Sequence, residues 1–315
     1  MKARTSLDAS PLPRDERLHA AVEHVLRARL ESRVRSLAFP RHYVNESEAN
    51  RVAGDWLASE FEAQGYSVER QGLFSNVVAR RTEAPPFLLV GAHFDSVPGT
   101  PGADDNASAV AALLEVSEAL MQHIEPLGVV FVGFNREEDS LMGSTDFVAN
   151  LRRESYAIER AHVLEMLGYA SSAPGSQAVP GDLPIVLPSE GNFIGIVGDH
   201  RAAESIDVAL SAARSHAEVP ALGLCLPSGL ELTLDVVRRS DHAPFWSAGI
   251  GACMWTDTAE FRNPHYHLSS DTPDTLDYEF LTQVTRMLVA TVVHEGRRLA
   301  SRKPLGSGLS GPGAR

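Results

Sequence analysis

Short apolar runs alternate with helix-like segments through the middle of the chain. Residues 87–90, 129–134 and 161–167 are almost continuously hydrophobic, which is typical of strands that are buried on both faces of a sheet. The segments between them, 108–123 and 144–151, have the composition and the length of helices. Strands that alternate with helices in this order predict right-handed crossovers and a largely parallel sheet.

Further elements extend this core on both sides. Residues 17–38 carry apolar side chains at helical spacing and predict one amphipathic helix. Asn45 and Glu48 form a capping pattern for a second helix, which is expected to end at Gly65. Additional strands are expected at 66–70, 76–81, 193–197 and 248–257, and additional helices at 201–217 and 278–299. The whole pattern predicts an α/β fold with a doubly wound, mostly parallel central sheet and helices on both faces.

The domain organisation is simple. The sequence contains no internal repeat and no linker that would divide it, so one domain is predicted over residues 14–300. Residues 1–13 are expected to be disordered, and residues 301–315, which are rich in Gly and Ser, form a flexible tail. Residues 169–191 are rich in Ser, Pro and Gly, and they predict a long loop that could shape a substrate pocket.

The composition limits which binding partners, disulfide bonds and cellular locations are expected. The formal net charge of −13 argues against nucleic acid or an anionic membrane as a partner. The two cysteines, Cys225 and Cys253, are too few for a disulfide framework and are expected to be small buried hydrophobes. The N-terminus lacks the apolar core of a secretory signal, and no apolar run approaches the ~18 residues that span a bilayer. A cytoplasmic location is therefore expected, while the oligomeric state is left open.

Side chains that commonly bind metals follow the ends of the predicted strands. His93 and Asp105 follow the first strand, the pair Glu137 and Glu138 follows the second, and Glu165 lies in the third apolar run. A buried, unpaired carboxylate would cost several kcal/mol, so Glu165 in particular needs a partner. Since the ends of parallel strands share one edge of a sheet, these groups are expected to meet around a shared cation.

A second source of ligands lies far down the chain, where His265 and His267 occur in a loop. Imidazole and carboxylate ligands together suit zinc, with cobalt or manganese as possible substitutes. One ion could take three protein ligands and a water, whereas a larger ligand set suits two ions about 3.5–4 Å apart. A glutamate that stays free of metal would then be available as a general base for the water between the ions.

Six short segments occur in a fixed order along the chain. They are GAHFDS, PGADDNAS, the Glu-Glu pair followed by MGS, EMLG, RSDHAPFW and HYHLSSDTPDTLD. This spaced set resembles the M28 family of zinc aminopeptidases over roughly residues 40–300. The resemblance implies a phosphorylase/hydrolase-like zinc exopeptidase fold and a centre with two zinc ions.

The resemblance also implies which residues hold the two ions. His93, Asp105 and Glu165 would hold one zinc ion, and Asp105, Glu138 and His267 would hold the other, so that Asp105 bridges them. Many relatives have Asp where Glu165 stands, and the longer side chain could alter the geometry or the metal preference.

The resemblance to the M28 family also implies catalytic roles for two further residues. Glu137 falls on the general base that activates the water bridging the two ions. Asp95 falls on the carboxylate that orients the metal-bound imidazole of His93.

The RSDHAPF and HYH motifs add two further groups. Arg239 and Tyr266 occupy positions that face the carbonyl oxygen of the scissile bond in some relatives, where they would stabilise an oxyanion. Asp241 and His242 are expected to fix their loop rather than to bind metal.

The leading hypothesis is a metal-dependent exopeptidase that removes the N-terminal residue of a peptide. One alternative is a glutaminyl cyclase-like acyltransferase with a single zinc ion, and another is a hydrolase of a non-peptide amide such as an N-acyl amino acid. A binding protein that has lost catalysis is disfavoured, because Glu137 and the whole ligand set are intact. The preferred N-terminal residue is left open.

Overall fold

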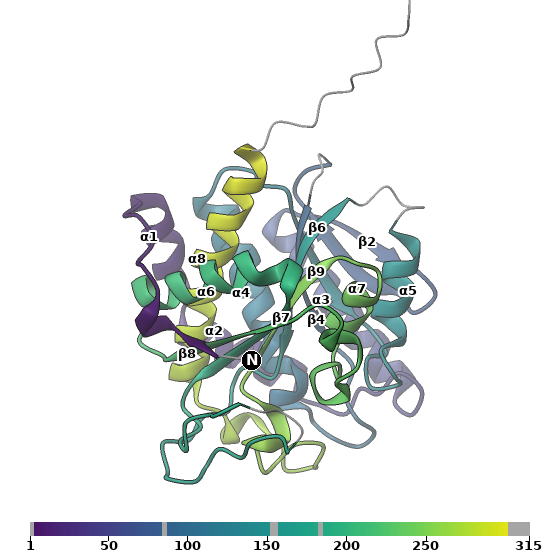
Figure 1. The fold of residues 1–315 in the computed structure, drawn as a ribbon. Coiled ribbons are helices and arrows are strands. Elements are labelled where there is room, and N and C mark those ends of the chain that lie inside the picture. Colours follow the sequence, from purple (N-terminus) through teal and green to yellow (C-terminus); the bar gives the residue numbers. More distant parts are fainter. Residues whose placement is uncertain (1–2, 84–86, 152–156, 182–184, 302–315) are drawn as a thin grey trace, which may run out of the picture.

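One mixed sheet of nine strands organises the described part of the chain (Figure 1). The computed structural model describes residues 3–83, 87–151, 157–181 and 185–301. The strand order is β1-β8-β7-β9-β6-β4-β5-β3-β2. The strands are β1 (Arg4–Thr5), β2 (Ser67–Gln71), β3 (Asn76–Arg80), β4 (Phe87–His93), β5 (Val129–Phe134), β6 (Ile158–Glu165), β7 (Ile194–Asp199), β8 (Ala221–Leu226) and β9 (Gly251–Thr256).

Helices cover both faces of this sheet (Figure 1). They are α1 (Glu16–Glu23), α2 (Arg27–Leu37), α3 (Ser47–Gln64), α4 (Ala109–His123), α5 (Met142–Asn150), α6 (Ala203–His216), α7 (His242–Ser247) and α8 (Tyr278–Ser301). One apolar core joins the sheet to α4, α6 and α8, and a smaller core joins the opposite face to α5 and α7. The predicted α/β class, with helices on both faces of a doubly wound sheet, is confirmed.

The centre of the sheet is parallel, and antiparallel pairs join it to both flanks, although β7 and β8 within one flank are parallel to each other. β4 pairs in parallel with both β5 and β6, and β6 pairs in parallel with β9. Every residue of β4 is buried, as its continuous apolar pattern predicts. Because these strands run the same way, the residues that follow them lie at one edge of the sheet.

The predicted N-terminal helix is two helices. α1 ends at Glu23 and α2 begins at Arg27, with extended backbone at Leu26 between them. The buried carboxylate of Glu115 in α4 accepts the Leu26 N–H at 3.3 Å and binds Arg29 Nε at 2.6 Å. These contacts supply hydrogen bonds at the point where the helix is interrupted. The apolar spacing continues through the interruption, so the periodicity of the sequence alone could not reveal it.

The end of α3 matches the prediction better than its start. Gly65 caps the helix with a φ of 99°, a left-handed conformation that glycine adopts without strain. The helix begins at Ser47, and its cap residue Glu46 makes no side-chain cap bond, so the capping role predicted for Asn45 is wrong.

The N-terminus differs from the expected disorder. Arg4 and Thr5 form β1, which pairs antiparallel with β8 opposite Gly223 and Leu222. Residues 302–315 of the predicted tail lie outside the described residues, and the domain bounds 14–300 stay a prediction. Both cysteines are free. In the described part of the chain, no helix has the length and apolarity needed to cross a membrane.

Candidate metal centre

The predicted ligands meet where the central parallel strands end. β4 ends at His93 and β6 ends at Glu165, while Glu138 lies in the loop that follows β5. Asp105 comes from the segment just before α4, and His267 comes from the loop between β9 and α8. Residues that are far apart in the sequence are thus brought together at one edge of the sheet.

Asp105 lies between two histidines. Its Oδ1 is 3.3 Å from His93 Nε2, and its Oδ2 is 3.2 Å from His267 Nε2. Glu165 Oε2 lies 3.6 Å from His93 Nε2, and Glu138 Oε2 lies 3.6 Å from His267 Nε2. The ligand atoms therefore form two groups that share Asp105, each with its atoms within 4.8 Å of one another.

The centre concentrates negative charge in a buried place. Burial, reinforced by the neighbouring carboxylates, raises the pKa of Glu137 and of Glu138 well above the usual range. Burial alone would lower the pKa of His93, but the carboxylates around it raise that pKa well above its ordinary value. Burial would raise the pKa of Asp105, but His267 and His93 hold it below its usual range.

Unpaired atoms within this cluster fit a bound cation. Glu138 Oε1 and both ring nitrogens of His93 are buried and have no hydrogen-bond partner within the described part of the chain. A buried acceptor without a partner costs about 1–3 kcal/mol, and a metal ion would supply that partner. Nitrogen and oxygen donors in two groups of three suit zinc, which takes three protein ligands in catalytic sites.

Asp95 ties together the loops that carry these ligands. It is fully buried, and its Oδ1 lies 3.4 Å from His93 Nδ1. The same carboxylate accepts the backbone N–H groups of Glu137 and Glu138, at 3.1 and 3.2 Å. Glu137 itself is buried, and its carboxylate lies in one group with His93 and Glu138.

Arg239 and Tyr266 lie beside the cluster. Arg239 Nη2 donates to Tyr266 Oη at 3.0 Å, and Arg239 Nη1 pairs with Glu260. The Tyr266 ring stacks on the His267 ring with centroids 3.7 Å apart, and burial raises the pKa of the Tyr266 phenol. Both side chains line a cavity together with Glu165.

Comparison with known proteins decides the family. The family model described as "Peptidase family M28" matches residues 76–292. This chain belongs to peptidase family M28.

Two curated relatives place the M28 chain more closely. It is 35% identical to the uncharacterized protein YfbL of Escherichia coli (strain K12), an alignment that covers 85% of this chain and 88% of that one. It is 28% identical to aminopeptidase YwaD of Bacillus subtilis (strain 168), over 66% of this chain and 41% of that one.

Solved structures share the fold of the M28 chain. The aminopeptidase LapA of Legionella pneumophila matches with a TM-score of 0.72 at 18% identity, covering 92% of this chain and 77% of LapA. A glutaminyl cyclase of Porphyromonas gingivalis matches with a TM-score of 0.63 at 20% identity, covering 87% of this chain and 99% of the cyclase. At these identities the likeness shows the fold alone.

The comparisons test the sequence-based hypotheses at the level of the family. The resemblance to M28 is confirmed, and so is the class of enzyme, a zinc metallopeptidase of the aminopeptidase type. The roles of single residues, the number of ions and the cytoplasmic location stay predictions.

Several residues that support the M28 centre were not singled out from the sequence. Asp271 accepts the backbone N–H groups of Asp104 and Asp105, at 2.9 and 3.1 Å, and so holds Asp105 in place. Ser240 Oγ donates to Glu165 Oε2 at 2.6 Å. Asp271 and Ser240 do lie within the motifs HYHLSSDTPDTLD and RSDHAPFW, so the motifs contained the signal, although their spacing did not reveal the contacts.

Arg41 is the least expected member of this support. It is fully buried and donates to the carbonyl oxygens of Phe94, Pro101 and Gly102, so it shapes the loop between His93 and Asp105. Burial lowers its pKa to about 10. A Cβ at Gly102 would lie 2.3 Å from the carbonyl oxygen of Asp105, so this turn requires glycine. No sequence motif around Arg41 indicates this role.

His242 has the structural role expected of it, whereas the role expected of Asp241 stays a prediction, because both of its carboxylate oxygens are buried with no hydrogen-bond partner among the described residues. Asp241 is fully buried and lies outside the ligand groups found among the described residues. His242 Nε2 lies 2.7 Å from the carbonyl oxygen of Val237, which anchors α7 to the preceding loop.

Proposed function

We propose that this protein is a zinc-dependent aminopeptidase that removes the N-terminal residue of a peptide with the help of two zinc ions. His93, Asp105 and Glu165 would hold one ion, and Asp105, Glu138 and His267 would hold the other. The observation that carries the proposal is the position of Asp105, whose two oxygens face two histidines at 3.3 and 3.2 Å. Cobalt or manganese could replace zinc at such a ligand set.

The protein's own groups would divide the remaining chemistry. Bound zinc lowers the pKa of coordinated water to about 7 and polarises a carbonyl group. Glu137 would accept a proton from the attacking water and deliver it to the leaving amine. Asp95 supports this role, because it fixes the backbone N–H of Glu137 at 3.1 Å.

Arg239 and Tyr266 would act on the carbonyl oxygen. Their N–H and O–H groups lie beside the cluster, where a tetrahedral oxyanion would form. The ion pair between Arg239 and Glu260 holds the guanidinium in place. Two donors at fixed positions need little rearrangement when the negative charge develops.

Glu137→Gln separates metal binding from proton transfer. The amide keeps the size of the side chain but cannot accept the proton, so we expect the metal content to stay unchanged and kcat to fall by about 10²–10⁴-fold. Metal content is measured by mass spectrometry and turnover with aminoacyl-nitroanilides. The matched control is Glu62→Gln on the exposed face of α3, which should change neither quantity. Turnover near the wild-type level in a fully loaded Glu137→Gln variant would falsify the role of Glu137.

A second candidate function is that of a glutaminyl cyclase-like acyltransferase with one zinc ion. The fold likeness to the cyclase of Porphyromonas gingivalis favours it. The metal-to-protein ratio separates the two candidates, since two ions support the aminopeptidase and one supports the cyclase. A parallel assay with a peptide that begins with glutamine, with and without a chelator, shows whether the product is a free amino acid or a cyclised peptide.

A further inference from the structure

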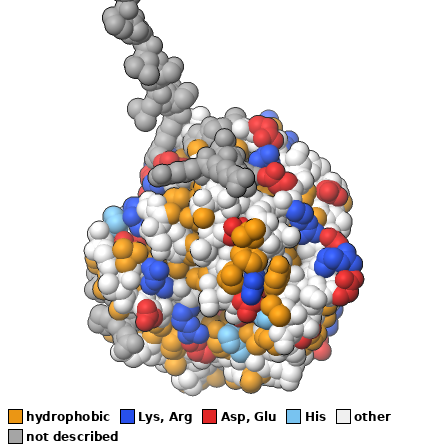
Figure 2. All heavy atoms as spheres, turned by 90° about the vertical axis from the view of Figure 1, so that its right-hand side faces the viewer, with side chains coloured by type: hydrophobic (Ala, Val, Ile, Leu, Met, Phe, Trp, Pro, Cys, Tyr) orange, Lys and Arg blue, Asp and Glu red, His pale blue; other side chains and the backbone are white. Residues whose placement is uncertain are grey.

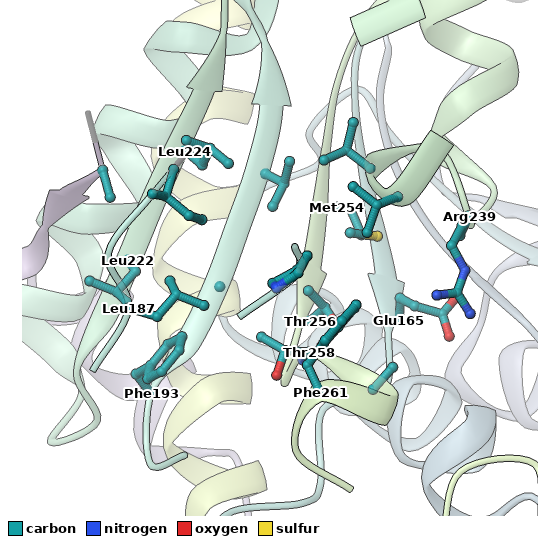
Figure 3. A pocket seen from close by; sticks show the side chains of 18 of the residues that line it. Glu165, Leu187, Phe193, Leu222, Leu224, Arg239, Met254, Thr256, Thr258 and Phe261 are labelled. Carbon is teal, nitrogen blue, oxygen red and sulfur yellow. The ribbon is translucent and has the colours of Figure 1, made fainter. Parts of the chain in front are cut away.

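An apolar trough leads away from the proposed metal centre across the outer strands of the sheet (Figure 3). Its charged lining residues include Glu165 and Arg239, which lie on one side in Figure 3, whereas Leu187, Phe193 and Leu222 lie on the other. The trough is an open cavity with a volume of about 120 Å³. The end of the trough at Glu165 and Arg239 is thus polar and lies beside the proposed metal centre, and the other end is apolar.

Loop segments and the N-terminus wall this part of the sheet. Ile185 and Leu187 come from the long loop after β6, Val236 comes from the segment before α7, and Ala3 lies just before β1. The loop at 169–191, which the sequence suggested could shape a substrate pocket, therefore contributes a wall of the trough through its described residues.

Strand β7 forms part of the floor of the trough, and Gly195 on this strand leaves space there because it has no side chain. On β7, Gly195 and Val197 face the trough, whereas Ile194 and Ile196 face the core on the opposite side of the sheet. A Cβ at Gly195 would meet nothing closer than the carbonyl oxygen of Thr256, at 3.3 Å. That contact is tight, so a methyl group would require a small shift of the Thr256 backbone, whereas no left-handed backbone conformation demands glycine here. Glycine therefore provides space along the trough.

The trough is longer than a natural side chain. It crosses from Glu165 on β6, over β9 and β7, to Leu224 on β8, which are successive strands of the sheet. Strands lie about 4.8 Å apart, so three spacings give a length of about 14 Å. An extended chain advances about 1.2 Å per bond, so a leucine side chain, whose tip lies three bonds from its Cα, covers about 4 Å of that length.

We propose that the substrate carries an unbranched apolar chain of about eight to ten carbons on the carbonyl side of the scissile amide bond. The inference rests on the proposed function, because it takes the carbonyl group to lie beside Glu165 and Arg239. Two substrate classes share this chemistry: amides of long-chain 2-amino acids, and amides of simple fatty acids that lack the amino group. The apolar lining from Met254 to Leu222 matches the chain in both classes.

Two series of p-nitroanilides test the proposal and distinguish its sources. One series carries linear alkanoyl groups and the other carries linear 2-aminoalkanoyl groups, each with two to ten carbons. A buried methylene group favours binding by about fourfold, so kcat/KM should keep rising from six to ten carbons in one of the series. The series that shows this rise identifies which of the two substrate classes the protein uses, amides of 2-amino acids or amides of simple fatty acids. A maximum at six carbons or fewer in both series, or no dependence on length, overturns the inference.

Substitution of the floor glycine tests the position of the chain. Gly195→Leu should lower kcat/KM for the ten-carbon substrate at least tenfold and leave the four-carbon substrate within twofold of wild type. Gly195→Ala is the matched control and should retain most of the long-chain activity, because its methyl group fills far less of the trough and requires only a small shift of the Thr256 backbone. Should the leucine variant fail to fold, Leu222→Gln at the half-buried far end gives the same comparison. Equal effects on all chain lengths contradict the assignment.

A binding measurement keeps this inference separate from the proposed function. Calorimetry follows the affinity of the zinc-loaded protein for linear alkanoates of four to ten carbons, and it requires no turnover. Affinity that rises with length, without hydrolysis of any nitroanilide, supports the trough and contradicts the aminopeptidase. Turnover of short aminoacyl substrates, with no effect of length on turnover or binding, supports the aminopeptidase and overturns the trough.

Discussion

Asp95 influences the centre through other residues rather than as one of the predicted ligands. Its carboxylate faces His93 Nδ1 at 3.4 Å and accepts two backbone N–H groups from the loop of Glu137 and Glu138. Such a carboxylate fixes the orientation of a ligating imidazole and raises its basicity.

Asp95→Asn should therefore weaken zinc binding by about 10–100-fold while the protein stays folded. Competition with a chromogenic chelator measures the affinity, and thermal unfolding checks the fold. Asp235→Asn, at an exposed position, is the control and should bind zinc like the wild type. Unchanged zinc affinity in Asp95→Asn would show that the histidine needs no such partner.

At this scale the sequence predicted the residues that meet at the candidate centre better than the residues that support them. His93 was found because it ends a buried strand, and strand ends collect at one edge of a sheet, whereas Glu165 was found as a carboxylate inside an apolar run. His267 was found only by resemblance, since nothing local distinguishes it from His265. Asp271 and Arg41 act through contacts with distant backbone groups, which no local pattern of residue types indicates.

At the scale of elements, long apolar runs were predicted well and short ones were missed. β5 was predicted at its observed bounds, 129–134, because its apolar run is continuous. β8 was missed although it is an apolar run between two prolines, and α7 was missed because six residues are too few to show a helical period. Both missed elements border the trough or the loop that carries Arg239.

The anchor of α7 should make stability depend on pH. Burial lowers the pKa of His242 from 6.5 to about 4, so the unfolded chain takes up a proton first as the pH falls. This residue should therefore cost stability between pH 6.5 and pH 4, by about 3 kcal/mol in total. His242→Gln can still donate to the Val237 carbonyl but does not titrate. We expect the free energy of unfolding, measured with urea, to fall less with acidification in this variant, and parallel pH profiles would contradict the assignment.

At the scale of the whole molecule, the protein carries an excess of negative charge, and part of that charge lies in the buried cluster of carboxylates at the candidate metal centre. The formal net charge is −13, and carboxylates from separate loops converge at the ends of the central strands. Figure 2 shows acidic and basic side chains interspersed over one face, so the surface there is not uniformly negative. Repulsion is concentrated instead where the ligand groups lie, and a divalent cation relieves it.

Removal of metal should consequently destabilise the fold. A ligand present at 100 times its Kd stabilises the folded state by about 2.7 kcal/mol, so chelation should lower Tm by several degrees. Calorimetry of the chelated protein measures the shift, and added zinc should reverse it while magnesium should not. A Tm that is unchanged after complete loss of metal would indicate that the centre does not depend on a cation.

The two-residue strand β1 has a consequence for solubility. β8 carries the sequence Ala-Leu-Gly-Leu-Cys-Leu, and an uncovered strand of this kind offers its backbone groups to another molecule. The opposite rim of the sheet, β2, is protected differently, by the charged side chains of Glu69 and Arg70. Removal of the first five residues would therefore expose the backbone N–H and C=O groups of β8 that now pair with β1. We expect the shortened protein to aggregate through pairing of these edge strands.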